Sequence, residues 1–162
     1  MTELPWIAVA RGFIGVREVP GPRSNSVILG WLTKLKAWWA EDATPWCGTF
    51  AATCLKDSGL TPPKDWFRAL SWLALPVRID RPAYGCVVVF SRQGGGHVGF
   101  VVGQDRAGNL MVLGGNQGDG VNIRPFDRKR AVGYRWPSTY PTAGRFLLPV
   151  LDSDGRVSED EA

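Results

Sequence analysis

Histidine and cysteine are both scarce in this sequence, which has one histidine, His97, and three cysteines among 162 residues. An odd and small number of cysteines does not build a disulfide framework, and no spacing of cysteine and histidine matches a zinc site. The sequence therefore predicts neither a metal site nor a cofactor. Any chemistry that the chain performs is expected to depend on its own side chains.

Long apolar runs are missing as well. Residues 1–21 include Glu3, Pro5, Arg11 and Arg17, so they do not form a basic segment followed by an apolar one, and we expect no signal peptide. No stretch approaches the roughly 18 consecutive apolar residues of a membrane span. We therefore expect a protein that is made in the cytoplasm and does not insert into a membrane.

Acidic charge is rare in most of the chain and concentrated at its end. Residues 152–162 hold five acids and one base, a net charge of −4, and the whole chain carries +4, so residues 1–151 carry +8. A basic body attracts polyanions such as nucleic acid or the anionic bacterial envelope. No run of basic residues is interleaved with aromatic ones, which makes nucleic acid the weaker candidate. We expect a single domain over residues 1–150 and an acidic, flexible tail over residues 151–162.

Helical spacing of apolar residues gives way to strand-like runs after Pro82. The expected helices span residues 5–16, 25–39, 45–58 and 64–74. The third of them has Thr44 as a possible N-cap and Pro45 at its first position. The expected strands span residues 86–91, 97–103, 110–116, 121–126 and 131–136. This order predicts an α+β fold in which N-terminal helices pack on a five- to six-stranded antiparallel sheet or small barrel.

Cys47 falls in the first turn of the third expected helix. A helix N-terminus places positive partial charge near a thiol and so lowers its pKa, which favours the nucleophilic thiolate. Cys54 and Cys86 have apolar neighbours in AATCLKD and YGCVVVF, where a free cysteine usually behaves as a small buried hydrophobe. Cys47 is therefore the candidate nucleophile.

His97 opens a strand directly after the glycines 94–96, and such a loop lets two elements approach closely. Its imidazole could act as a base for Cys47. Asn116 ends the neighbouring run LMVLGGN, where its side-chain oxygen could accept the imidazole N–H, as in a Cys-His-Asn arrangement. Asp119 and Asp42 are alternatives for this third role.

Three segments carry these residues, namely TPWCGTFAATCLKDSGL, GGGHVGFVVG and LMVLGGNQGDGVNI. Together they resemble a family of small phage and bacterial cysteine hydrolases related to the NlpC-like and CHAP peptidoglycan peptidases. The segment ARGFIGVREVPGPRSNSVI is also similar, so the resemblance covers roughly residues 5–137. It implies a papain-like fold with Cys47 as nucleophile, His97 as general base and Asn116 as the third member. It further implies that the backbone N–H of Cys47 contributes to an oxyanion hole.

The resemblance also implies an activity. We expect a peptidoglycan hydrolase that cleaves an amide bond of the stem peptide through a thioester, as an endolysin-like endopeptidase. The alternatives are an N-acetylmuramoyl-L-alanine amidase with the same triad, a non-catalytic wall-binding module and a transglutaminase-like acyltransferase. Trp46, Trp72 and Gln117 are candidate substrate-binding residues.

The expected partner is bacterial peptidoglycan, bound by a monomer, with no nucleic acid. The biological setting that the resemblance implies is a phage endolysin, a particle-associated lysin or a toxin delivered between bacteria. In each setting the protein would reach the wall after release, export or delivery.

Overall fold

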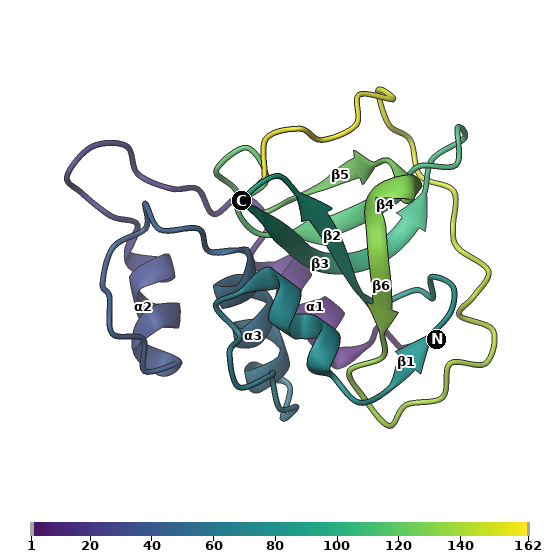
Figure 1. Ribbon diagram of the computed structural model, residues 1–162, viewed down its shortest axis with the longest axis horizontal. Coiled ribbons are helices and arrows are strands. Elements are labelled where there is room, and N and C mark those ends of the chain that lie inside the picture. Colours follow the sequence, from purple (N-terminus) through teal and green to yellow (C-terminus); the bar gives the residue numbers. More distant parts are fainter. Residues whose placement is uncertain (1, 162) are drawn as a thin grey trace.

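The computed structural model describes residues 2–161, which form helices packed against an antiparallel sheet (Figure 1). Residues 1 and 162, the outermost residues of the expected domain and tail, lie outside the described range. The helices are α1 (Pro5–Gly12), α2 (Ser26–Lys34) and α3 (Cys47–Asp57), with short 3-10 helices η1 (Ala69–Ala74) and η2 (Arg128–Arg130). The strands are β1 (Arg78–Ile79), β2 (Val87–Arg92), β3 (Gly95–Gln104), β4 (Leu110–Gly114), β5 (Asn122–Phe126) and β6 (Ala131–Arg135). The α+β class is confirmed.

The sheet is open rather than closed into a barrel. Within residues 2–161 its six strands follow the order β1-β6-β2-β3-β4-β5, and every neighbouring pair is antiparallel. The five expected strands are present, and β1 is an addition that pairs with β6. The sequence does not signal β1, because a strand of two residues is too short to show an alternating pattern.

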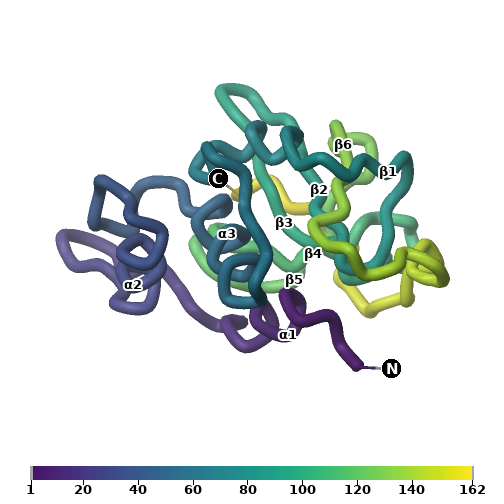
Figure 2. The backbone as a smooth tube through the Cα atoms, turned by 90° about the horizontal axis from the view of Figure 1, so that it is seen from below, coloured from purple at the N-terminus to yellow at the C-terminus, as the bar shows by residue number. Residues whose placement is uncertain are grey.

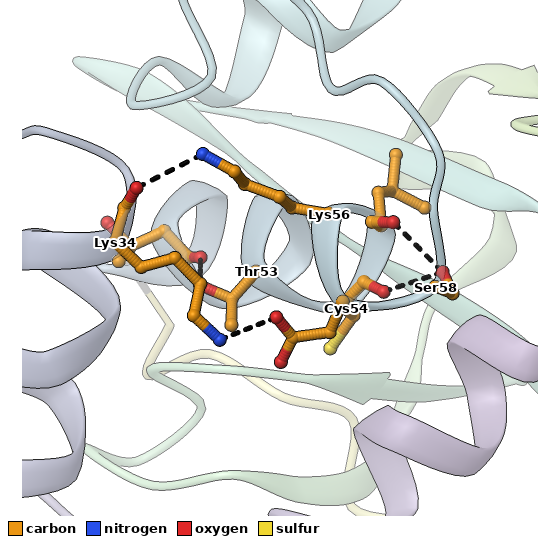
Figure 3. Close-up of polar contacts among 8 residues, drawn as sticks. Lys34, Thr53, Cys54, Lys56 and Ser58 are labelled. Atoms are coloured by element: carbon orange, nitrogen blue, oxygen red, sulfur yellow. Dashed lines mark hydrogen bonds and ion pairs between the residues drawn. The ribbon is translucent and has the colours of Figure 1, made fainter.

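Helix α3 lies between the sheet and α2 (Figures 1 and 2). Nine of its residues are buried, from Cys47 to Leu55, because one of its sides contacts β3 and the others contact α1 and α2. Lys34 at the end of α2 reaches Asp57 of α3 with 2.6 Å between Nζ and Oδ1 (Figure 3). The Nζ of Lys56 donates to the carbonyl of Lys34 at 3.1 Å, so the two helices are joined at this end.

The helix that carries Cys47 begins two residues later than expected. Thr44 does not cap it, because the backbone N–H and the hydroxyl of Thr44 both donate to the Glu41 carboxylate. The N-cap is Trp46, which makes no side-chain capping hydrogen bond, and Cys47 becomes the first helical residue. Cys47 therefore stands closer to the helix end than the sequence predicted.

The expected helix over residues 64–74 is a turn followed by the 3-10 helix η1. The indole Nε1 of Trp72 donates to the carbonyl of Trp66 at 2.9 Å. In an α-helix that carbonyl would accept the backbone N–H of Leu70 instead. A buried tryptophan thus satisfies the carbonyl that would have continued the helix.

The expected flexible tail makes defined contacts with the body of the protein. The backbone N–H of Ser158 donates to the Pro125 carbonyl at 2.8 Å, and Glu161 is 7% exposed and forms an ion pair with Arg130. The backbone N–H of Gly118 donates to the carbonyl of Asp160 at 2.6 Å. Backbone hydrogen bonds and an ion pair therefore join the tail to the body, whereas the composition of the tail led us to expect a flexible segment.

Replacing Arg130 tests whether this attachment stabilises the fold. The Arg130 guanidinium also lies over the rings of Phe90 and Phe126, at 5.7 and 5.6 Å from their centroids. We expect Arg130→Ala to lower the free energy of unfolding in urea by about 1–3 kcal/mol, because Glu161 stays buried without its partner and the ring contacts are lost.

Arg106→Ala is the matched control. Arg106 pairs with Asp152 of the same tail at 3.1 Å, but the two side chains are 81% and 90% exposed. Exposed pairs contribute about 0–1 kcal/mol, so this variant should unfold close to the parent protein. Equal losses in the two variants would contradict the role assigned to the buried pair.

Candidate active site

The fold places Cys47 at the start of α3, beside strand β3. The backbone N–H groups in the first turn of a helix have no partner within the helix, and they carry its positive partial charge. Cys47 is 4% exposed and lines a cleft of about 570 Å³. The cleft is lined by Pro45, Cys47, Phe67, Arg68, Ala69, Leu70, Ser71, Arg92, Gly94, Gly95 and Gly96.

Among the three free cysteines only Cys47 has a thiol pKa below its ordinary value. Burial raises the pKa of Cys47, but hydrogen bonding to the His97 side chain, the charge of His97 and the backbone N–H groups of Val98 and Gly48 outweigh it and lower the pKa below the ordinary value. Burial and, after it, the charge of Asp57 raise the pKa of Cys54 well above that value. Burial raises the pKa of Cys86 to about 12.

His97 is fully buried on β3, opposite Phe90 of β2 in the strand register. Its ring lies parallel to that of Phe126, with 5.3 Å between centroids and 5° between planes. Phe126 in turn stacks on Phe90 at 4.6 Å. The two phenyl rings therefore limit the rotation of the imidazole and keep its plane fixed beside Cys47.

Gln117 occupies the Nε2 side of His97, with its Oε1 at 3.0 Å. The orientation of this buried amide follows from its other end, since Nε2 of Gln117 donates to carbonyl oxygens of Val112 and Asn122 at 3.2 and 3.0 Å and to Asn122 Oδ1 at 2.9 Å. A flipped amide would place its oxygen against these acceptors. His97 must therefore donate through Nε2, which leaves Nδ1 as the nitrogen that can accept a proton from Cys47.

A glycine makes room for this contact. A Cβ built on Gly114 would overlap Oε1 of Gln117 and would lie 3.3 Å from Nε2 of His97. Any larger residue at the end of β4 would push Gln117 away from the imidazole. In the GGNQ segment, the first glycine, Gly114, leaves room for the Gln117 side chain, and the last residue, Gln117, supplies the amide that contacts His97.

Asn116, expected beside His97, lies in the turn after β4 with φ 58°. Asparagine tolerates this left-handed conformation better than most residues do. Consecutive residues of a strand point to opposite faces of the sheet, but the turn after β4 breaks this alternation. The sequence therefore does not show whether the side chain of residue 116 or that of residue 117 faces the imidazole. The amide seen against Nε2 belongs to Gln117, which we had expected only as a substrate-binding residue.

The two alternative acids make contacts elsewhere. The carboxylate of Asp42 accepts hydrogen bonds from the backbone N–H groups of Val19 and Asn25, both at 2.8 Å, and so joins two loops. Asp119 is exposed in a turn with φ 62°, where its carbonyl accepts the N–H of Glu18 at 2.9 Å. The Asp42 carboxylate therefore has a structural role away from the imidazole, and Asp119 lies in an exposed turn.

Trp46 and Trp72, expected as walls of the substrate groove, are 1% and 0% exposed. The indole of Trp46 donates to Glu18 Oε1 at 2.9 Å, and that of Trp72 donates to Trp66, as described above. In this structure both rings are therefore buried rather than exposed along the cleft. The cleft is walled instead by Phe67, Leu70 and two arginines, which no local motif marks as site residues.

Residues 39–116 match the family model of the CHAP domain. The matched segment contains Cys47 and His97 and ends at Asn116, one residue before Gln117. The chain is related to the CHAP cysteine peptidases. CHAP domains are typically hydrolases that act on peptidoglycan, as amidases or peptidases, and the match therefore indicates a peptidoglycan hydrolase. A search of curated proteins found no match.

Two further observations concern metal-ligating groups and long apolar helices in this CHAP-related chain. Within residues 2–161, no group of three or more histidine, cysteine, aspartate or glutamate side chains is placed to hold a metal ion. No helix in the same range is both long and apolar enough to cross a membrane.

The lowered pKa of Cys47 predicts selective alkylation. A thiol with a lowered pKa keeps its thiolate at lower pH, whereas Cys54 and Cys86 stay protonated and buried. Iodoacetamide at pH 7 should therefore label Cys47 of the CHAP segment first, as read by peptide mass spectrometry. His97→Ala should slow this labelling and shift its pH dependence upward, because the hydrogen bond and the charge that lower the pKa are removed. Labelling of Cys54 or Cys86 at the same rate would contradict the assignment.

Proposed function

We propose that the chain is a cysteine peptidase or amidase that cleaves an amide bond in the peptide part of peptidoglycan through a thioester. The observation that supports this most directly is the arrangement at Cys47. The only thiol with a lowered pKa stands at a helix N-terminus, against an imidazole whose opposite nitrogen is held by a buried amide. This arrangement prepares a nucleophile and a proton acceptor side by side.

In the first half of the proposed reaction the Cys47 sulfur attacks the carbonyl carbon of the amide, and its proton resides on His97. The oxygen of the tetrahedral intermediate becomes negative, and in this proposal backbone N–H groups in the first turn of α3 stabilise it. His97 then donates its proton to the nitrogen of the leaving amine. The C–N bond breaks, the amine departs and the acyl group remains on Cys47 as a thioester.

In the second half His97 takes a proton from a water molecule, and the resulting hydroxide attacks the thioester carbonyl. The C–S bond breaks, which restores the Cys47 thiolate beside protonated His97, and the carboxylic acid product loses its proton to solvent and departs as a carboxylate. Because the imidazole acts as acid and then as base, its tautomer matters at both stages. We assign Gln117 to the orienting role for which the sequence suggested Asn116.

The proposal favours an endopeptidase that cuts within the stem peptide, in the manner of an endolysin. The alternative is an amidase that cuts between the glycan lactyl group and the first alanine. A basic body attracted to the anionic wall suits either activity. We further propose that the protein acts on the wall after release from a cell or delivery by a particle.

Digestion of purified peptidoglycan tests both the activity and the bond. The parent protein should release fragments whose newly exposed amine, identified by mass spectrometry after labelling, belongs to an internal residue of the stem. An exposed first alanine would indicate the amidase instead. Cys47→Ala should lose roughly 1,000-fold or more of the rate, as nucleophile removal does in related mechanisms.

Cys54→Ala is the control for this experiment, since it removes a buried thiol from the same helix without touching the site. Circular dichroism should show that both variants remain folded. A Cys47→Ala variant that retains near-parental activity would refute the cysteine mechanism. An intact parent protein that leaves the wall undigested would refute the proposed activity.

The role of Gln117 is tested against that of its neighbour. Gln117→Ala should lower kcat by roughly 10- to 1,000-fold, because the imidazole loses the acceptor that sets its tautomer. Asn116→Gly is the matched variant, since glycine adopts φ 58° without strain and only the side chain is lost. It should remain within about threefold of the parent rate if position 116 serves the turn. The reverse result would return the orienting role to Asn116.

A further inference from the structure

Four aromatic rings form a continuous cluster at the edge of the core and beside the Cys47 cleft. We define this aromatic surface as Trp38, Trp39, Trp66 and Phe67. The ring centroids of Trp38 and Trp39 are 4.7 Å apart, those of Trp38 and Phe67 are 5.0 Å apart, and those of Trp39 and Trp66 are 5.7 Å apart. Trp66 and Phe67 close the cluster at 5.6 Å. Each ring contacts at least two others, so the surface is one unit.

The exposure of this cluster is costly for a protein of this size. Trp38 is 77% exposed, and the other three rings are only partly buried. Burying an aromatic side chain stabilises a fold by several times the thermal energy, so tryptophans are rarely left in water without a reason. Contiguous exposed apolar surface of this kind usually marks a binding site.

The aromatic surface is fixed in position relative to the nucleophile. A Cβ built on Gly48, the residue after Cys47, would overlap the carbonyl oxygen of Trp66. The backbone of Trp66 therefore packs directly on the first turn of α3, and the buried indole of Trp72 holds the same carbonyl at 2.9 Å. Both contacts are made to the backbone carbonyl of Trp66, so the chain that carries Trp66 and Phe67 is held next to the helix turn of Cys47.

The surface is also continuous with the cleft, because Phe67 belongs to both. Beyond Phe67 the cleft is lined by Arg68 and Arg92, and no acidic residue is among its lining residues. A ligand that spans cleft and rings should therefore present flat, weakly polar faces at one end and carboxylates at the other. Pyranose rings have C–H groups that pack against the electron-rich faces of aromatic rings, and peptide stems of the wall carry carboxylates.

We propose that the aromatic surface is a sugar-binding subsite that holds the glycan strand of peptidoglycan while the attached peptide enters the Cys47 cleft. The proposal rests on the proposed function for the identity of the substrate. It adds that recognition includes the sugars and not the peptide alone. Because the rings adjoin the cleft, the bond that is cut lies within a few residues of the glycan.

Binding measured without turnover tests the subsite. In a Cys47→Ala background, calorimetry compares a disaccharide–tetrapeptide muropeptide with the free tetrapeptide. Adding Trp38→Ala should weaken muropeptide binding by about tenfold and leave peptide binding unchanged, since an exposed ring contributes to stacking but little to folding. Trp38→Phe should recover part of the loss. Leu147→Ala, at a residue that is 86% exposed and outside the aromatic surface, should change neither affinity.

The outcomes separate this proposal from the proposed function. Hydrolysis is not required for binding, so a parent protein that cuts no bond but binds the muropeptide through Trp38 would keep the subsite and refute the enzyme. Unchanged muropeptide affinity in Trp38→Ala would overturn the subsite, and equal losses for both ligands would assign the rings to the peptide. Tighter Trp38-dependent binding of a single-stranded oligonucleotide than of the muropeptide would also overturn it.

Discussion

The hydrogen bond between Gln117 and His97 is the constraint on which the rest of the site depends. The oxygen and nitrogen of a side-chain amide have nearly the same shape, so the orientation of the amide is assigned from its hydrogen-bond partners. Here the Nε2 group of Gln117 faces three acceptors on β4 and β5, so its oxygen must face the imidazole. The tautomer of His97 is thus set by the pairing of two strands, and the proton acceptor is turned toward Cys47 before any substrate arrives.

The same constraint links the C-terminal tail to the site. The His97 ring stacks on Phe126, the guanidinium of Arg130 lies over Phe126 and Phe90, and Glu161 pairs with Arg130. Gln117 also forms an isolated antiparallel bridge with Glu161. The tail therefore contacts both supports of the imidazole, the stacked rings and the amide. This is a structural argument for counting residues 158–161 with the domain, although their composition alone is typical of a disordered terminus.

The sequence predicted the features that follow from residue type and hydrophobic spacing. It predicted less well the contacts that depend on the direction in which a side chain points. A cysteine after Pro45–Trp46, a histidine after three glycines and a change from helical to alternating spacing led to the correct fold class and to Cys47 beside His97. The sequence placed the start of α3 two residues too early, because the Thr44 side chain that was expected to cap the helix bonds to Glu41 instead. The amide of Gln117 and the stack on Phe126 depend on which way side chains leave a turn, which spacing does not encode.

The tryptophans show why this limit matters for substrate recognition. Composition predicts surplus aromatic surface but not which rings supply it, and the buried Trp46 and Trp72 were first assigned to the groove. In the structure these two tryptophans are buried, and Trp72 supports other residues of the site. The indole of the buried Trp72 donates to the carbonyl of Trp66, and the same carbonyl packs against Gly48, so Trp66 and its neighbour Phe67 stay next to the nucleophile. A buried tryptophan therefore contributes to the site by positioning others, and its loss should disturb recognition as well as stability.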